Sequence, residues 1–294
     1  MNVQHFYDAR TNTLSYVVYD PTTRDAVAID PVLDYEPVGS FTFTESIDAL
    51  TAFVRQKELK LHLALETHAH ADHISGGQLL KRRFGAPVVI GANITMVQRT
   101  FRDLLALEHL ATDGSQFDRL VKEGDVLQAG SLTIRVLDTP GHTPACVTYQ
   151  IGDALFTGDV LFMDDYGTGR CDFPNGSAAA MYDSIQKLYA LPDATKVHPG
   201  HDYPPGRPVR HETTIGASKD HNPQLDATTD RETFVKLRQG RDATLATPKL
   251  LFQSVQINVD GGRMPPAGAG GRRLMKLPMN LFRPADELGE PKPR

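Results

Sequence analysis

The segment from Thr67 to His73 constrains the fold and chemistry of this chain more than any other, because three histidines and one aspartate fall within six residues. An apolar run at residues 61–65, typical of a buried strand, precedes it, and residues 77–84 predict a helix after it. Imidazole nitrogens and carboxylate oxygens bind zinc, iron or manganese, and a loop that leaves a strand can aim alternate side chains at one point. We therefore favour a metal site here over a His-rich surface turn.

Three further candidate ligands occur later in the chain, each where a predicted strand ends. His142 lies in a Thr-Pro-Gly-His-Thr stretch, Asp159 in Phe-Thr-Gly-Asp, and His201 in His-Pro-Gly-His-Asp. Taken singly, each would more often be a helix cap or a solvated loop residue. Their order after the His-rich segment favours one shared site.

The rest of the pattern predicts a mixed α/β protein. Residues 14–19 and 26–29 alternate with the two-residue period of strands on either side of a turn-rich segment, which predicts an antiparallel hairpin. Thr44 and the capping-box sequence that begins at Thr229 indicate two helix starts. Strands are further expected at residues 87–90, 132–137 and within 147–156, and helices at residues 44–57, 93–107, 177–190, 210–220 and 229–241.

Composition excludes several classes of protein. The chain has 294 residues, 40% of them apolar, and its 31 Lys and Arg against 36 Asp and Glu give a net charge of −5. That charge provides no basic field for nucleic acid or an anionic membrane. No apolar run is long enough for a bilayer, the N-terminus lacks a signal-peptide pattern, and two cysteines form no disulfide framework. We expect a cytoplasmic protein, and the sequence leaves a homodimer open.

A composition change suggests how the chain is organised. Residues 1–207 are rich in predicted strands and hold all the candidate ligands, whereas residues 208–294 are helical and loop-forming. We expect a catalytic domain and a C-terminal extension packed on the same domain. Gly, Pro and Arg accumulate past Gly261, and the tail from about residue 283 is expected to be loose.

The ordered ligand set resembles the metallo-β-lactamase superfamily over about residues 10–205. The resemblance implies an αββα four-layer sandwich with its metal site at one edge of the two sheets. In dinuclear members, one metal takes the positions matching His68, His70 and His142. The other takes those matching Asp72, His73 and His201, and Asp159 bridges the two. All seven positions are present here.

One branch of the superfamily fits the sequence best. The stretch Gly-Thr-Gly-Arg-Cys-Asp-Phe at residues 167–173 is similar to the Gly-x-Gly-Arg-x-Asp-Phe stretch of persulfide dioxygenases, and residues 201–203 and 222–223 also match. Residues 163–168 and the C-terminal extension most resemble the bacterial Blh-type β-lactamase-like proteins, which are associated with sulfide detoxification. The implied reaction is oxidation of glutathione persulfide, or a similar low-molecular-weight persulfide, with O2 to sulfite and thiol.

The same resemblance implies one Fe(II) per chain. Its ligands would be His68, His142 and Asp159, since two imidazoles and a carboxylate form the facial triad of non-haem iron oxygenases. Zinc could occupy the same pocket but has no redox couple with which to activate O2. The remaining ligand-type residues would orient the iron ligands and hold water, or hold a second metal: His70, Asp72, His73 and His201.

Substrate contacts are implied for Arg170 and Tyr203, and Asp159 and Tyr203 are the implied catalytic residues. A guanidinium can pair with a glutathione carboxylate, and a phenol can donate to a sulfur anion. The alternative for Arg170 is a structural salt bridge to Asp172. Cys171 stands beside this cation, but a catalytic role is not required of it.

Three other functions remain open from the sequence. The complete seven-residue set also suits a dinuclear zinc thioesterase of glyoxalase II type. Another metallo-hydrolase, such as a lactonase or β-lactamase, fits the ligands but not the stretch at residues 167–173. A non-catalytic sulfide-sensing or regulator-binding module would have less need of an intact ligand set.

Overall fold

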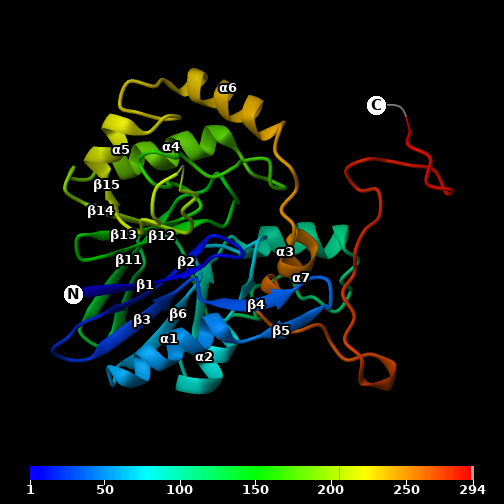
Figure 1. Cartoon of the computed structure of the whole chain (residues 1–294), viewed down its shortest axis with the longest axis horizontal. Helices are drawn as coiled ribbons and strands as arrows, with labels where there is room; N and C mark the ends of the chain where they lie inside the picture. Colours follow the sequence, from blue (N-terminus) through cyan, green and yellow to red (C-terminus); the bar gives the residue numbers. More distant parts are fainter. Residues whose placement is uncertain (205, 293–294) are drawn as a thin grey trace.

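The computed structural model describes residues 1–204 and 206–292, and it contains two six-stranded sheets packed face to face between layers of helices (Figure 1). The first sheet has the order β1 (Asn2–Asp8), β2 (Thr13–Tyr19), β3 (Asp25–Ile29), β6 (Lys60–Leu65), β8 (Val88–Gly91) and β9 (Arg119–Val121). The second has the order β10 (Val126–Ala129), β11 (Leu132–Asp138), β12 (Val147–Ile151), β13 (Ala154–Gly158), β14 (Lys196–Pro199) and β15 (Thr213–Thr214). A small sheet joins β5 (Phe41–Phe43), β4 (Val32–Glu36) and β7 (Ile74–Ser75).

Helices cover both outer faces of this pair of sheets. On the side of the first sheet lie α1 (Glu45–Gln56), α2 (Gly77–Phe84), α3 (Ile94–Leu104) and α7 (Leu251–Asn258). On the side of the second sheet lie α4 (Ala178–Tyr189), α5 (Ile215–His221) and α6 (Arg231–Asp242). A 3-10 turn, Ala269–Gly271, follows α7.

The two-residue period of the strands explains why three apolar layers form. Successive side chains of a strand point to opposite faces of its sheet. In β2, Tyr16 and Val18 are buried between the two sheets, whereas Val17 packs with the helices outside. In β13, Phe156 lies between the sheets and Leu155 packs with α4. The four-layer αββα sandwich implied by the resemblance is confirmed.

Most expected elements are confirmed to within a few residues, and the exceptions have local causes. The helix expected from residue 210 begins only at Ile215, because Thr213 and Thr214 pair with β14 as a short strand. The cap of α6 is Asp230, which accepts from the amide of Thr233, and not Thr229. Thr44 precedes α1, but its side chain does not cap the helix.

The C-terminal part of the chain does not stay on one side of the molecule. After α6 it crosses to the side of the first sheet, where α7 packs beside β7 of the small sheet, and Leu251, Val255 and Val259 join the core under the helices. The tail then leaves the body (Figure 1). The domain division at residue 207 stays a prediction. Among the described residues, no helix has the length and apolar character needed to cross a membrane.

Candidate metal centre

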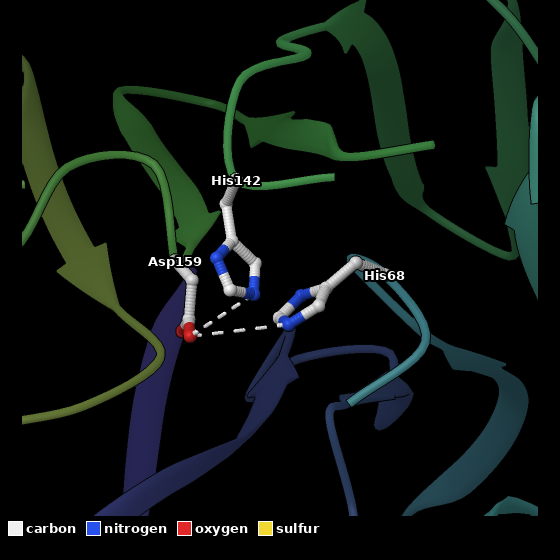
Figure 2. Close-up of side chains that lie close together, drawn as sticks. All are labelled: His68, His142 and Asp159. Carbon is white, nitrogen blue, oxygen red and sulfur yellow. Dashed lines mark ion pairs between the residues drawn. The ribbon is translucent and has the colours of Figure 1, made fainter. Parts of the chain in front are cut away.

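Three side chains from three loops converge at one edge of the sandwich (Figure 2). His68 follows β6, His142 follows β11 and Asp159 follows β13. One carboxylate oxygen of Asp159 lies 3.9 Å from Nε2 of His68 and 3.7 Å from Nε2 of His142. Ligand atoms of all three residues lie within 4.8 Å of one another, so a single cation could contact them all. We call these three residues the triad.

Neighbouring groups fix which nitrogen of each triad imidazole faces the site. Thr67 donates its hydroxyl proton to Asp30, so Nδ1–H of His68 must donate to the Thr67 oxygen at 3.0 Å. Nδ1–H of His142 donates to the carbonyl oxygen of Arg170 at 2.8 Å. Since one nitrogen of a neutral imidazole carries the proton, Nε2 of each ring is left as a ligand.

Two glycines allow the loops to approach this closely. Gly158 ends β13 with a positive φ of 51°, and a Cβ there would lie 2.4 Å from the hydroxyl of Thr67. A Cβ on Gly169 would lie 1.9 Å from the carbonyl oxygen of Asp159. Only glycine leaves room at these two positions, so the close approach of the loops depends on these two glycines.

A second group lies directly beside the triad. Ligand atoms of His70, Asp72 and His73 fall within 4.8 Å of one another, and we call these residues the second set. His201 lies between the two groups, because its Nε2 is 3.4 Å from a carboxylate oxygen of Asp72 and 3.4 Å from one of Asp159. The structure therefore brings all seven predicted ligand residues into one region.

His70 differs from the triad histidines in what holds it. Its Nε2 lies 3.1 Å from a carboxylate oxygen of Asp30 and 3.6 Å from one of Glu66, and both acids are buried. The sequence analysis missed Asp30 and Glu66. Their only local signal is position, since Asp30 follows β3 and Glu66 stands between β6 and the His-rich segment.

Buried atoms without partners test whether the residues fit a metal. Among the described residues, none hydrogen-bonds to Nε2 of His68, Nδ1 of His70, Nε2 of His73 or Oδ1 of Asp159, although all four atoms are buried. Buried polar atoms are nearly always paired, so four lone pairs aimed into one region need an explanation. A cation bound by imidazole and carboxylate would pair them, and the residues fit one.

Proton affinity differs among the side chains of the two groups. Burial, together with neighbouring histidines, lowers the pKa of His68 well below its usual value. Burial also lowers the pKa of His70, but Asp30 and Glu66 outweigh it and raise that pKa well above the usual value. Burial lowers the pKa of His73 to about 4. Burial raises the pKa of Asp72, but His201 and the other histidines outweigh it and bring it to about 2.

A pocket of about 630 Å³ opens above these residues. Arg170 and Tyr203, the predicted substrate residues, both line it. Nε and Nη2 of Arg170 donate to the two carboxylate oxygens of Asp172 at 2.6 and 2.7 Å, which is the structural salt bridge that the sequence left open. The ring of Tyr203 stacks on that of His201, with centroids 5.5 Å apart.

Two further cationic side chains, Arg10 and Lys249, line the pocket, and the sequence analysis missed both. Arg10 forms ion pairs with Asp8, Asp34 and Glu45. Lys249 forms no ion pair within the part of the chain that the structure describes. It comes from the C-terminal extension, in a segment with no motif to mark it. Unlike Arg10 and Arg170, Lys249 therefore has a charge that no described carboxylate neutralises, so it can pair with an anionic ligand.

Both cysteines are buried and free. Burial raises the pKa of Cys146 to about 12 and raises that of Cys171 as well. The adjacent guanidinium therefore does not activate Cys171, in keeping with the expectation that it has no catalytic role.

The family profile of the metallo-beta-lactamase superfamily matches residues 10–201. The chain belongs to this superfamily. The match extends from the start of the β1–β2 turn to the last of the seven ligand-type residues, His201.

Several superfamily members are similar over most of this chain. A beta-lactamase hydrolase-like protein of Xylella fastidiosa is 48% identical over 95% of this chain and 65% of its own length. The mitochondrial persulfide dioxygenase ETHE1 of Bos taurus is 32% identical over 90% of each chain. The crystal structure of ETHE1 from Myxococcus xanthus matches with a TM-score of 0.73 and 36% identity, over 90% of this chain and 100% of that one. This chain thus spans about two thirds of the Xylella protein.

Proposed function

We propose that this protein is an Fe(II)-dependent persulfide dioxygenase with one iron per chain, held by His68, His142 and Asp159. The observation that carries the proposal is the triad itself, whose Nε2 atoms and carboxylate converge beneath the pocket. Two imidazoles and one carboxylate are typical of non-haem Fe(II) oxygenases. The likeness to the two proteins named ETHE1 supports the same assignment.

The proposed substrate is glutathione persulfide or a similar low-molecular-weight persulfide. In the reaction, RSSH, O2 and H2O give RSH, SO3²⁻ and two protons. The outer sulfur loses four electrons and O2 gains four, so no further oxidant is required. Bound Fe(II) would supply the redox couple that this reaction needs and that zinc lacks.

The chain's own residues would bind and orient the persulfide. Lys249 offers an ammonium group to a carboxylate of the thiol carrier, and Arg170 retains N–H groups beyond those directed at Asp172 and Ala246. Burial, with Asp159 nearby, raises the pKa of Tyr203, so its phenol keeps its proton and can donate to a sulfur anion. Holding the persulfide in one orientation over the triad would make the reaction effectively intramolecular.

A dinuclear zinc hydrolase is the competing function. The observation that favours it is the second set, whose ligand atoms lie as close together as those of the triad. Two metals in neighbouring sites can activate a hydroxide between them. However, Asp30 and Glu66 hold His70 through the nitrogen opposite the site and raise its pKa, so a metal bound by Nδ1 of His70 would have to displace a proton.

The experiment that separates the two functions compares metal forms of one preparation. Protein purified without O2 is stripped, reloaded with either Fe(II) or Zn²⁺, and given glutathione persulfide or a glutathione thioester. We expect the iron form to consume one O2 per persulfide and release sulfite, with no activity in the zinc form. Hydrolysis of the thioester by the zinc form, without O2 uptake by the iron form, would replace this proposal with the hydrolase.

A further inference from the structure

The last residue of each of two C-terminal helices forms hydrogen bonds with the backbone of one loop of the metal centre. Asp242 ends α6, and Asn258 ends α7. Both side chains are buried, and neither belongs to the seven predicted ligand residues. Each acts on a different group, because Asp242 reaches the loop that orients His142 and Asn258 reaches the loop that carries the second set.

Asp242 controls a peptide group that in turn orients a triad ligand. The carbonyl of Arg170 accepts from Nδ1–H of His142 at 2.8 Å. The N–H of the same peptide group, that of Cys171, donates to Oδ2 of Asp242 at 2.8 Å. A peptide group is planar and rigid, so an acceptor on its N–H fixes the direction of its carbonyl. Asp242 thereby fixes the ring of His142 and leaves Nε2 facing Asp159.

A buried cation keeps Asp242 in place. Nε and Nη2 of Arg238 donate to Oδ1 of Asp242 at 2.9 and 2.5 Å, which leaves Oδ2 for the Cys171 amide. Nη1 of Arg238 also donates to the carbonyl of Thr168 at 3.3 Å and to the side-chain oxygen of Gln224 at 2.8 Å. The whole loop from Thr168 to Cys171 is therefore held against α6.

Asn258 holds the backbone of the second set in a comparable way. Its Nδ2 donates to the carbonyl of His70 at 2.8 Å and to that of His73 at 2.7 Å. Its Oδ1 accepts from the amide of Ser75 at 2.9 Å. These three bonds use both donors and the acceptor of the amide. A carboxylate or an apolar side chain of similar size could not replace it.

We propose that Asp242 and Asn258 are positioning residues, Asp242 for the triad through His142 and Asn258 for the second set through the backbone of residues 70–75. Neither touches a ligand atom, and each orients its group through one or more peptide groups. The inference does not depend on which metal binds or on which reaction follows. It predicts that changing each residue affects its own group and spares the other.

The test for Asp242 replaces the buried ion pair without leaving a lone charge. In R238L/D242L the Cys171 amide loses its acceptor, whereas in R238Q/D242N an amide oxygen remains for it. Imidazole ¹⁵N spectra of the metal-free protein should show His142 in one tautomer in wild type and R238Q/D242N, and a tautomer mixture in R238L/D242L. Titration with Zn²⁺ should show first-site affinity about 10- to 100-fold lower in R238L/D242L.

A milder variant tests the same role if the R238L/D242L protein does not fold. Asp242→Glu keeps the charge beside Arg238 but moves the carboxylate away from the Cys171 amide, and it should shift the His142 spectrum in the same direction. Unchanged tautomer and Zn²⁺ affinity in D242E, or in R238L/D242L, would overturn the role of Asp242.

The test for Asn258 uses Asn258→Asp and Asn258→Leu, with Ser254→Ala on the same buried helix as the matched control. The Ser254 hydroxyl is buried without a hydrogen-bond partner among the described residues, so its loss should change little. Both Asn258 variants should shift the ¹⁵N signals of His70 and His73 and weaken binding of a second Zn²⁺ by about 10- to 100-fold. They should leave the His142 signals unchanged.

The role of Asn258 would be wrong if both variants kept the His70 and His73 signals of S254A. The variants of Asp242 and Asn258 could instead weaken Zn²⁺ binding at both groups equally and in proportion to a loss of thermal stability. The two helices would then support the fold in general, and the whole proposal would be overturned.

Discussion

The triad and the second set contain the same residue types but differ in the partners that hold one imidazole of the second set, that of His70. A hydroxyl and a peptide carbonyl, both neutral, accept from the triad histidines His68 and His142. Two carboxylates, Asp30 and Glu66, flank His70. Neutral acceptors add little to the proton affinity of an imidazole, whereas carboxylates stabilise the imidazolium more strongly. Ligand identity alone therefore does not decide which group binds metal.

The two groups contribute unequally to the pocket. The triad supplies His142 and Asp159 to the lining and the second set supplies Asp72, while His68, His70 and His73 are buried and do not line it. A metal on the triad would face a ligand directly. Variants that remove one group at a time should make this difference measurable.

The largest effect is expected at Asp159. Asp159→Asn removes the only anionic ligand of the triad, so it should abolish iron binding and O2 uptake with persulfide. Iron content and oxygen-electrode rates measure both losses. Asp153→Asn, on an exposed turn of the same hairpin, is the matched control and should behave like wild type. Retention of iron by D159N would contradict the triad assignment.

Removal of a second-set residue should cost less. His73→Ala leaves the triad intact and disturbs only its surroundings, where losses of about 10- to 100-fold in activity or metal affinity are usual. Iron should still bind at one equivalent per chain. If H73A lost iron as completely as D159N, the two groups would act as one site.

The groups should also differ in their response to pH. Because Asp30 and Glu66 raise the pKa of His70, metal binding to the second set must release the proton that His70 holds, and the affinity of that set should fall as pH falls. The lowered pKa of His68 leaves that ligand unprotonated already. Zn²⁺ titrations between about pH 6 and pH 8 should show the second-site affinity changing by about tenfold per pH unit for the one proton released, and the first changing less. If the affinities of the two sites changed equally with pH, the two groups would not differ in proton release.

Changes in the pocket should affect substrate binding more than chemistry. Lys249→Met removes a cation without a described partner and should raise KM for glutathione persulfide by about two- to five-fold with kcat unchanged, as loss of one exposed ion pair would. Arg170→Lys should raise KM less, because Asp172 already occupies part of its guanidinium. Lys236→Met, on an exposed part of α6, serves as the control. A larger KM effect for R170K than for K249M would reverse these roles.

The smallest effect is expected at Cys171. Because burial raises its thiol pKa, Cys171→Ala should keep wild-type kcat and KM, and alkylating reagents near neutral pH should leave activity intact. Activity lost in proportion to alkylation of Cys171 would show that the thiol takes part in the reaction.

The sequence predicted the parts of the site that carry a local signal. The triad residues each follow a strand whose apolar pattern is visible, so their convergence at one sheet edge could be expected. Asp30, Glu66 and Asn258 have no such signal. Asn258 lies 188 residues from His70 and contacts it only because the chain after α6 crosses to the side of the first sheet. Asn258 lies on α7, which is short and has no side-chain cap from which the sequence could predict it.

The difference between the two groups is tested most directly by locating the metal in crystals of protein purified without O2. Anomalous diffraction measured on either side of the iron absorption edge should give one peak per chain, among Nε2 of His68, Nε2 of His142 and the carboxylate of Asp159. A second peak of similar height among His70, Asp72 and His73, or zinc in both places, would contradict the account.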